Sequence, residues 1–327
     1  MRVHGERSKT VTGFWWEREA PLWSLPLLPL AAAYRAGAAL HRAAVRPVHA
    51  KVPVISVGNL TVGGAGKTPV SLCIAQRLVA RGRRPAVLSR GYGRKLRTPL
   101  QVSPDSTVQD VGDEPLLLAR RGLTVFVGPS RAVLAGLAVE RGADVLVLDD
   151  GLQHYALARD LDVVVADASN PFGNGHGLPL GPLREPLSAL ARVRRGLLWL
   201  SRCDLPRDPR VLRLPAWPAV ESDYATSVDL RGKRVFLFAG IARPAAFEAT
   251  VRALGAEIAG SRWFGDHHLY TKYDLQTLRR EAGDAQLWTT EKDLVRIEQR
   301  DGICAVTVEV RILRGADALD AALGAVL

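Results

Sequence analysis

One stretch decides how this chain folds: Val57-Gly58-Asn59-Leu60-Thr61-Val62-Gly63-Gly64-Ala65-Gly66-Lys67-Thr68. An apolar segment typical of a strand, residues 52–57, leads into it, and a helical pattern over residues 68–81 follows. In such a position glycines let backbone N–H groups surround phosphate oxygens, and the helix N-terminus adds a partial positive charge. The stretch therefore predicts a phosphate-binding loop of the P-loop type.

Two side chains of this loop carry the expected chemistry. We expect Lys67 to reach the β- and γ-phosphates of a nucleotide and the Thr68 hydroxyl to bind magnesium. The strict P-loop pattern has glycine where this chain has Thr61, and the glycine pair that follows supplies the flexibility instead. The residues of the loop expected to bind the nucleotide are Gly58, Asn59, Thr61, Val62, Gly63, Gly64, Ala65, Gly66, Lys67 and Thr68.

Two carboxylates end a second apolar segment. Residues 145–150 have the sequence Val-Leu-Val-Leu-Asp-Asp, so Asp149 and Asp150 come directly after a predicted strand. In isolation this pattern is common where an acidic strand end enters a turn. Beside a phosphate loop, a carboxylate at the end of a neighbouring parallel strand can bind magnesium, directly or through water. The two motifs together predict binding of a nucleoside triphosphate and Mg²⁺.

Apolar strands alternate with helical segments along most of the chain, and this alternation predicts an α/β fold with a parallel sheet covered on both faces. We expect residues 47–160 to form a P-loop domain of α/β/α architecture. Residues 161–315 are expected to form a second, smaller α/β domain with linker strands. A predicted C-terminal helix, residues 316–327, would join the first domain.

Composition sets limits on function. The chain has 327 residues, with 44 Lys and Arg against 33 Asp and Glu, a net charge of +11, and only seven of the basic residues are lysines. An arginine-rich chain suits phosphate, anionic lipid or nucleic acid, and composition alone does not choose among them. The three cysteines, Cys73, Cys203 and Cys304, are far apart, which argues against a disulfide framework or a structural zinc site.

Residues 1–46 form a separate N-terminal segment. Its uncharged run, residues 20–34, contains three prolines and is shorter than the roughly 20 residues that a spanning helix needs. Over residues 30–46, helical periodicity separates a narrow arginine stripe from an apolar face. The arginines are Arg35, Arg42 and Arg46, and the apolar face comprises Leu30, Tyr34, Gly37, Leu40, Ala44 and Val45. This pattern fits an interfacial membrane-associating helix and, equally, a helix packed on its own domain.

Two other classes of protein use a P-loop. A regulatory GTPase needs an Asn-Lys-x-Asp motif after a later strand, and the stretch Ser201-Arg202-Cys203-Asp204 lacks both the Asn and the Lys. A nucleic-acid-dependent ATPase would suit the net charge of +11, but the arginines are dispersed and no recognised binding module is present. We therefore predict no nucleic-acid partner and keep the regulatory or accessory NTPase as the alternative.

Further motifs follow in a fixed order along the chain. They are residues 54–61 leading into Gly-Gly-Ala-Gly-Lys-Thr-Pro, Ser89-Arg90-Gly91-Tyr92-Gly93, Gly112-Asp113-Glu114-Pro115, Asp149-Asp150-Gly151-Leu152-Gln153-His154, Gly181-Pro182-Leu183-Arg184-Glu185-Pro186, Asp266-His267-His268 and Thr290-Glu291-Lys292-Asp293. In this combination the chain closely resembles the tetraacyldisaccharide 4′-kinase family, over nearly its whole length.

The resemblance implies an enzyme at the cytoplasmic face of the bacterial inner membrane. Such an enzyme transfers the γ-phosphate of ATP, with Mg²⁺, to the 4′-hydroxyl of a tetraacylated glucosamine disaccharide 1-phosphate. The product is lipid IVA, an intermediate of lipid A. The resemblance also implies two α/β/α domains with the site between them, the second being Rossmann-like, and we expect a monomer.

The resemblance assigns roles to residues outside the loop. It implies that Asp113, assisted by His267, handles the hydroxyl proton, although from sequence alone Asp113 could instead cap a helix beginning near Pro115. Arginine's planar fork suits phosphate, which favours Arg131 and Arg184, and less strongly Arg90. The expected magnesium ligands are Thr68, Asp149, Asp150 and Glu114; the catalytic set is Asp113, His267, Lys67, Arg131 and Arg184; and Gln153 and His154 are expected to shape the nucleotide site. Glu185 is expected to act from the second domain.

Overall fold

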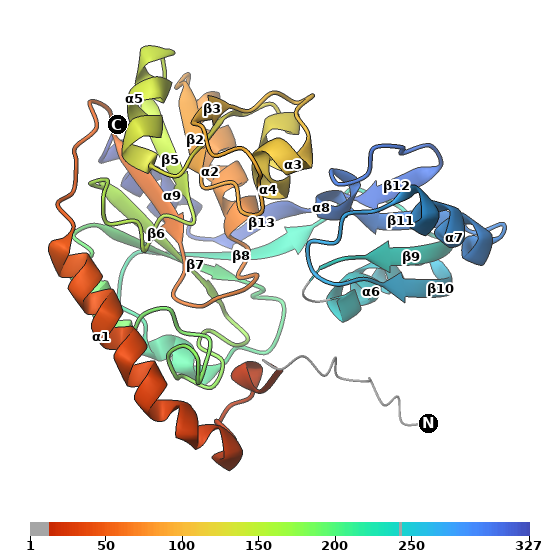
Figure 1. The fold of residues 1–327 in the computed structure, drawn as a ribbon, viewed down its shortest axis with the longest axis horizontal. Coiled ribbons are helices and arrows are strands. Elements are labelled where there is room, and N and C mark those ends of the chain that lie inside the picture. The colour runs from red at the N-terminus through yellow and green to blue at the C-terminus, as the bar shows by residue number, and fades with distance from the viewer. Residues whose placement is uncertain (1–12, 242–243) are drawn as a thin grey trace.

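Two sheets of different size organise the molecule, a computed structural model that describes residues 13–241 and 244–327 (Figure 1). The larger sheet has nine strands in the order β13-β8-β7-β6-β1-β5-β2-β4-β3, and the smaller has four in the order β10-β9-β11-β12. Residues 1–12, part of the predicted N-terminal segment, lie outside the described residues.

The strands of the larger sheet are β1 (Val54–Gly58), β2 (Pro85–Ser89), β3 (Leu100–Gln101), β4 (Thr124–Val127), β5 (Val145–Asp149), β6 (Leu161–Asp167), β7 (Gly196–Ser201), β8 (Ala219–Ala225) and β13 (Glu309–Arg314). Those of the smaller sheet are β9 (Arg234–Ala239), β10 (Glu257–Trp263), β11 (Gln286–Thr290) and β12 (Ile303–Val306). The α-helices are α1 (Leu28–Ala44), α2 (Lys67–Ala80), α3 (Val108–Val111), α4 (Asp113–Arg120), α5 (Arg131–Glu140), α6 (Pro244–Ala253), α7 (Lys272–Ala282), α8 (Glu291–Leu294) and α9 (Ala316–Gly324). Short 3₁₀ helices lie at Gly13–Trp16, Leu22–Leu27, Leu187–Arg192 and Pro209–Arg213.

Strand β1 lies in the middle of the larger sheet. It pairs in parallel with β5 on one side and β6 on the other, and Val57 is opposite Asp149. Because parallel strands end at the same edge of a sheet, this register brings the glycine-rich loop and the paired aspartates together. Both strands are buried along their whole length, as apolar runs without alternation predict.

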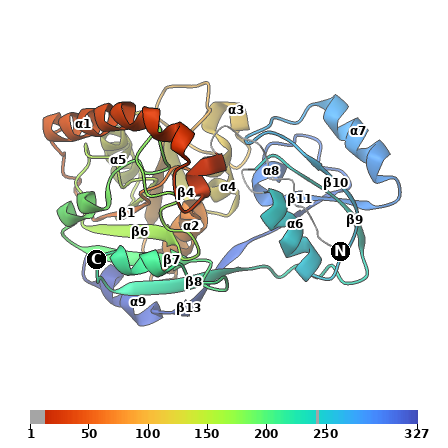
Figure 2. The same cartoon turned by 90° about the horizontal axis from the view of Figure 1, so that it is seen from below.

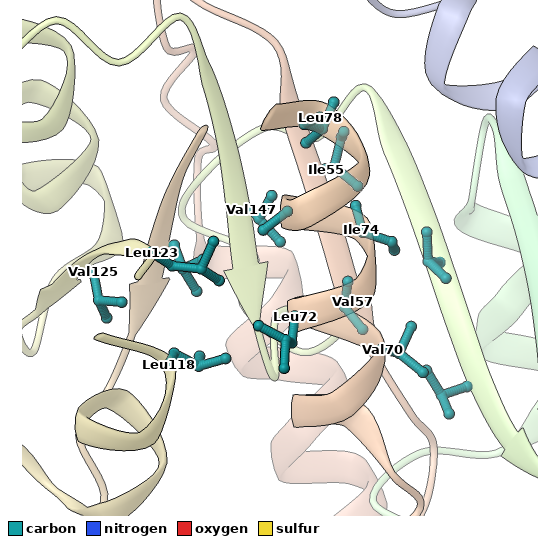
Figure 3. Close-up of a cluster of buried hydrophobic side chains, with 14 of the residues drawn as sticks. Ile55, Val57, Val70, Leu72, Ile74, Leu78, Leu118, Leu123, Val125 and Val147 are labelled. Atoms are coloured by element: carbon teal, nitrogen blue, oxygen red, sulfur yellow. The ribbon is translucent and has the colours of Figure 1, made fainter. Parts of the chain in front are cut away.

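Helix α2 covers one face of this central region. Its apolar positions Val70, Ile74 and Leu78 recur at helical spacing and pack on Ile55 and Val57 of β1 (Figure 3). All five side chains are fully buried. Their packing holds the first turn of α2, and therefore Lys67 and Thr68, in a fixed position relative to the end of β1.

The larger sheet extends well past residue 160, where sequence analysis set the boundary between the two domains. Strand β6 pairs with β1 and β7 pairs with β6, all in parallel. The boundary at 160 was wrong in this respect, because the chain returns from β5 to the other side of β1 instead of starting a new sheet. We propose a division after β8, with residues 226–308 as the smaller unit.

Two strands lead from one unit to the other. Strand β8 leads out of the larger sheet toward β9, and β13 returns from the smaller sheet to pair antiparallel with β8 (Figure 2). Only two residues separate β12 in the smaller sheet from β13 in the larger. Helix α9 then packs on the larger sheet, where Leu319 and Leu323 are buried.

Helix α1 lies along the outside of the larger unit, on the side away from the smaller sheet (Figure 1). It begins two residues earlier than predicted, and only Ala31 of its 17 residues is fully buried. Leu30, Tyr34 and Leu40 of its apolar face are exposed, whereas Arg42 contacts the body of the protein. Within residues 13–241 and 244–327 there is no helix with the length and apolar character that crossing a membrane requires.

Candidate active site

Glycines in the loop between β1 and α2 are required by close contacts. Gly66 precedes α2 with φ at +85°, in the left-handed region that favours glycine. A Cβ on Gly58 would lie 2.5 Å from the Leu152 side chain, so the end of β1 and the Asp-Asp-Gly-Leu turn touch directly. A steric contact at Gly58 and a left-handed conformation at Gly66 therefore restrict the backbone at both ends of the loop.

The loop that contains residues 181–186 is hydrogen-bonded to the phosphate loop. The Val62 N–H donates to the carbonyl of Pro182 at 2.8 Å, and the Arg184 N–H donates to the carbonyl of Leu60 at 2.7 Å. These bonds attach the Gly-Pro-Leu-Arg-Glu-Pro motif to the phosphate loop and place Arg184 beside it. Thr61, which departs from the strict pattern, accepts a hydrogen bond from the Asn59 amide at 3.0 Å and so stabilises the loop internally.

Lys67 and Arg184 converge on one carboxylate. The Lys67 ammonium lies 3.5 Å from Asp150 and donates to the Asn59 side-chain carbonyl at 3.1 Å. Arg184 donates to both oxygens of Asp150, at 3.0 and 2.8 Å. Burial alone would raise the pKa of Asp150, but the charges of Lys67 and Arg184 outweigh it and lower that pKa. Asp150 also has φ at +55°, an uncommon conformation that is often found at functional sites.

Asp149 has a different environment although it is the next residue. It is buried, and its carboxylate accepts a hydrogen bond from the Ser71 hydroxyl at 2.8 Å. Burial and the negative charge of Glu114 raise the pKa of Asp149. In the described part of the chain no cation lies within ion-pair distance of this carboxylate.

The donors around Asp149 fit a magnesium ion in their chemistry. Mg²⁺ takes oxygen ligands, commonly one or two carboxylates together with substrate phosphates. Asp149 and the Thr68 hydroxyl offer such oxygens, whereas Asp150 and Glu114 are each engaged by cationic side chains. Among residues 13–241 and 244–327, no group of three or more His, Cys, Asp or Glu side chains is arranged so that it could bind a metal ion by itself.

Positive charge gathers beside the end of β5. Arg131 begins α5, is buried, and donates to the Asp149 carbonyl at 3.5 Å. Burial lowers the pKa of Arg131 to about 10, and burial followed by the charges of Arg131, Arg159 and Arg90 lowers the pKa of His154 to about 4. Buried nitrogens of Arg131 and His154 have no hydrogen-bond partner among the described residues. The unsatisfied Arg131 donor and the excess positive charge suit an anion such as a phosphate.

Glu185 belongs to the larger unit, which corrects the expectation that it acts from the second domain. Its buried carboxylate accepts hydrogen bonds from Tyr155, from Arg192 at 2.7 Å and from Gln153 at 3.2 Å, and Arg42 of α1 lies 3.5 Å away. The motif follows β6, and the pairing of β6 with β1, which places it in the larger unit, leaves no local mark in the sequence. Glu185 thus ties α1 and Gln153 to the loop that carries Arg184.

Asp113 and His267 meet across the contact between the two units. The His267 Nδ1 atom lies 2.9 Å from Asp113 Oδ2, although the residues are 154 positions apart. Asp113 is the first residue of α4 and Gly112 is its N-cap, so Asp113 is not the N-cap of this helix. Burial alone would raise the pKa of Asp113, but its hydrogen bond with His267 and the charges of Lys292 and Arg296 outweigh burial and lower that pKa far below its usual range.

The two adjacent histidines point to different partners. His268 Nε2 lies 3.2 Å from Asp274 of α7, and its ring stacks on Phe264 with 4.5 Å between centroids. His267 contacts Asp113 instead, and the centroid of the Tyr92 ring lies 5.6 Å from the centroid of the His267 ring. The two imidazole rings therefore lie in separate surroundings.

Sequence reasoning missed one residue of this region. Arg296 donates to Asp113 from Nε at 3.0 Å and from Nη2 at 2.5 Å, and its side chain is only 1% exposed. Lys292, which stands in a quoted motif but received no role, donates to Glu114 at 3.1 Å. The signal that could have found Arg296 is its position three residues after the Thr-Glu-Lys-Asp motif.

The parallel sheet, the loop after β1 and the carboxylates after β5 define a class of protein: an α/β nucleotide-binding protein of the P-loop type. The family model of tetraacyldisaccharide-1-P 4′-kinase (LpxK) matches residues 23–327. The chain belongs to the tetraacyldisaccharide 4′-kinase family.

Individual relatives agree with this membership. A tetraacyldisaccharide 4′-kinase of Anaeromyxobacter sp. (strain K) is 49% identical to the chain, over 96% of this chain and 94% of the relative. A tetraacyldisaccharide 4′-kinase of Rhodospirillum centenum is 44% identical, over 89% of this chain and 88% of the relative. The crystal structure of LpxK from Aquifex aeolicus in complex with ATP has a TM-score of 0.80 at 25% identity and covers 94% of this chain and 100% of that one. These findings confirm the P-loop kinase fold and do not support the alternative of a regulatory or accessory NTPase.

Proposed function

We propose that this chain transfers the γ-phosphate of ATP to the 4′-hydroxyl of a tetraacylated glucosamine disaccharide 1-phosphate and so forms lipid IVA. The observation that carries the proposal is the hydrogen-bonded pair Asp113–His267 beside a P-loop. Transfer to an alcohol requires a group that takes the hydroxyl proton, and a histidine oriented by a carboxylate is suited to that task. The family membership supplies the identity of the alcohol.

The loop and the arginines bind and neutralise the phosphates in this proposal. Lys67 leaves Asp150 for the β- and γ-phosphates, and Arg184 is freed from the same carboxylate to contact the transferred group. Arg131 and His154 offer buried nitrogens without partners in the described structure, on the side of β5. Gln153 donates to the Asn59 carbonyl at 3.0 Å and so helps hold the loop in shape. Phosphoryl transfer depends mainly on such positioning and charge stabilisation.

In this proposal Asp149 and the Thr68 hydroxyl would hold magnesium, and Asp150 and Glu114 would have to give up their ion pairs before they could join them. The ion would neutralise the charge that develops on the phosphate oxygens. Before it binds, Lys292 and Lys67 partly neutralise the same carboxylates. We also propose that the enzyme acts as a monomer.

Helix α1 serves the lipid side of the reaction. A groove runs between α1 and the Arg184 loop, lined by Ala32, Arg35, Ala36, Ala38, Ala39, Arg42, Arg184, Glu185 and Pro186. Nearby apolar side chains are unusually exposed, Leu22 at 84%, Trp23 at 67% and Leu40 at 72%. Exposed apolar groups next to arginines suit the interface of an anionic membrane. We propose that the enzyme works at the cytoplasmic face of the inner membrane.

The reaction is tested by incubating the purified chain with the tetraacylated disaccharide 1-phosphate and either ATP or GTP. We expect ATP-dependent formation of the 4′-phosphorylated lipid, requiring Mg²⁺, with little transfer from GTP. Hydrolysis of GTP without transfer to the lipid would contradict the proposal.

The membrane role is tested by replacing Leu30, Tyr34 and Leu40 together with serine. We expect weaker sedimentation with anionic lipid vesicles and unchanged ATP binding, because these side chains lie on the exposed face of α1 and away from the P-loop. Removing residues 1–46 should act in the same direction, and high salt should partly mimic it, since each arginine near an anionic surface contributes roughly 1 kcal/mol.

The control variant replaces three exposed leucines elsewhere, Leu96, Leu212 and Leu313, with serine. It should sediment like the wild type. Equal loss of sedimentation in both variants would mean that α1 is not the membrane-binding element.

A further inference from the structure

Helix α8 and the residues just after it form ion pairs with α4 across the contact between the two units. Arg121, the residue after α4, binds Glu291 with both ends of its guanidinium, at 2.6 and 2.8 Å. Lys292 binds Glu114 at 3.1 Å. The third pair joins Arg296 to Asp113, and it differs from the others because it is almost completely buried.

Arg296 uses every arm of its guanidinium in this contact. Nε and Nη2 donate to Asp113 Oδ2, at 3.0 and 2.5 Å. Nη1 donates to the Gly240 carbonyl at 2.9 Å and to Asp293 at 3.0 Å. Asp293 is fixed in turn by the Tyr270 hydroxyl at 2.8 Å and by the Gly240 N–H at 2.8 Å. The planar fork of arginine is pre-organised for such multiple contacts.

These contacts hold both members of the Asp113–His267 pair. The Gly240 carbonyl that accepts from Arg296 also accepts from the His267 backbone N–H, at 3.1 Å. His267 has φ at +61°, a conformation that a side chain rarely adopts unless its surroundings enforce it. Arg296 therefore determines where the carboxylate lies and contributes to where the backbone of the histidine lies.

The same contacts decide which nitrogen of His267 carries a proton. Asp113 Oδ2 accepts two N–H groups of Arg296 and lies against His267 Nδ1, while Oδ1 accepts the Glu114 N–H at 2.9 Å. A carboxylate that only accepts requires Nδ1 to donate, so the neutral ring carries its proton on Nδ1, and Nε2, which lies 3.9 Å from the Asp266 carboxylate, is the nitrogen that can take another. His267 is 36% exposed, so the ring remains accessible while Asp113 is closed off.

We propose that Arg296 is a positioning residue for phosphoryl transfer, which orients Asp113 and through it sets the proton-accepting form of His267. The proposal rests on the proposed function for its kinetic test. It assigns the stretch around Thr-Glu-Lys-Asp a role in the reaction in addition to joining the two units.

The kinetic test compares Arg296→Lys with Arg121→Lys. Both changes weaken an ion pair between α4 and the α8 region, but only Arg296 touches Asp113. We expect Arg296→Lys to lower kcat by about 10²-fold, the size of effect that a misplacement of about 1 Å can have, with little change in KM for ATP. Arg121→Lys should leave kcat unchanged. Equal losses of kcat in the two variants would overturn the proposal, because both would then act only by joining the units.

A double variant separates action through Asp113 from an independent effect. In an Asp113→Asn background, Arg296→Lys should cost little further kcat, since residues that act as one unit are not additive. Multiplicative losses would contradict the proposal. Thermal denaturation and ATP binding check that each variant is folded. Should Arg296→Lys not fold, Asp293→Asn weakens, among the contacts of Arg296, the one made by Nη1, and it should lower kcat less, in the same direction. An unchanged kcat there would also count against the proposal.

A spectroscopic measurement tests the same idea without any substrate. Long-range proton–nitrogen NMR spectra of the histidine rings report which nitrogen is protonated, and His267→Ala identifies the signals of His267. We expect the Nδ1-protonated form in the wild type and in Arg121→Lys, and a shift toward the Nε2-protonated form in Arg296→Lys. An unchanged His267 in Arg296→Lys would overturn the proposal. If the wild type failed to phosphorylate the lipid, the proposed function would fall, while this comparison would still decide the role of Arg296.

Discussion

The P-loop region and the contact between α4 and the α8 region both rest on ion pairs, but the pairs differ in kind. In the P-loop region, Lys67 and Arg184 share Asp150, whose side chain is 37% exposed. In the contact, Arg296 and Asp113 are 1% and 5% exposed. The P-loop pairs are partly open to solvent, with Lys67 13% and Arg184 25% exposed, and such pairs cost less to exchange, whereas breaking a fully buried pair leaves an uncompensated charge. The first set can therefore exchange its partners for phosphate, and the second is suited to staying in place during turnover.

The two regions also differ in how they are assembled. The phosphate loop is one run of twelve residues, shaped by its own glycines. The Asp113–His267–Arg296 group comes from three distant parts of the chain and exists only when the two units are in contact. We expect changes in the first region to act on nucleotide binding and changes in the second to act on the chemical step.

The largest effect is expected at Asp113. Asp113→Asn keeps the shape and removes the charge that orients His267, so kcat should fall by about 10²–10⁴-fold, the usual contribution of general acid–base catalysis, while KM for ATP changes little. Steady-state kinetics at varied ATP measure this. His267→Ala removes the proton acceptor itself and should cost a similar amount, and the double variant should cost less than the product of the two losses. Asp105→Asn, in an exposed loop, is the control. A large rise in KM for ATP in Asp113→Asn would contradict the expectation that this region acts on the chemical step and not on nucleotide binding.

A somewhat smaller loss of rate, combined with weaker binding, is expected at Lys67. Lys67→Ala removes a cation that contacts phosphate, and one oriented electrostatic contact is worth about 10²–10³ in rate. Isothermal titration with ATP should show weaker binding as well, in contrast to Asp113→Asn. Lys51→Ala, an exposed lysine, serves as the control. Near-normal turnover in Lys67→Ala would show that the nucleotide site lies elsewhere.

Acid unfolding sharpens the comparison through Asp113. Its pKa is lowered in the folded protein, so its ionised form stabilises the fold above the unfolded-state pKa of about 3.9 and loses this contribution as the pH falls below that value. The contribution is expected to be on the order of 2 kcal/mol. Urea denaturation at pH 7 and pH 2 should show a smaller loss of stability in Asp113→Asn than in the wild type. Identical losses would mean that the buried pair does not stabilise the charge.

The smallest effect concerns two adjacent carboxylates of the P-loop region. Asp149 is buried beside Ser71 and near the negative charge of Glu114, so Asp149→Asn should stabilise the nucleotide-free protein at pH 8, by on the order of 1 kcal/mol, while it lowers turnover. Asp150→Asn should destabilise it instead, because Lys67 and Arg184 lose their partner. Thermal denaturation in the absence of Mg²⁺ compares the two. Shifts of the same sign in both variants would contradict this contrast.

Prediction from sequence succeeded where the signal is local. The glycine-rich loop, the helix after it and the paired aspartates are contiguous, so their spacing alone indicated a P-loop at a strand-to-helix junction. The Asp113–His267 contact was implied by resemblance to a family, and the two side chains do meet. Their catalytic roles, like those of Arg131 and Arg184, stay predictions.

Prediction missed features that depend on the path of the chain between the sheets. Strands β6 and β12 are both largely apolar, yet one pairs in the larger sheet and the other in the smaller. Strand β10 was not predicted, because most of its residues are exposed and its alternation is weak. The apolar sequence of a strand predicts that the strand is buried, but it does not say which strands lie next to it. Periodicity therefore could not show whether the strands after residue 160 belong to the first sheet or to a second one.

The sequence by itself determined the phosphate loop, the α/β class and the carboxylates that accompany the loop, because each depends on residues close together in the chain and on backbone rules that act over a few positions. Only the tertiary structure decided that Arg296 lies on Asp113, that Glu185 supports the P-loop side and that Lys67 is paired with Asp150. The first contact joins the two units and the other two join distant segments of the larger one, and their partners are selected by packing and by the need to pair buried charges, which no local pattern records.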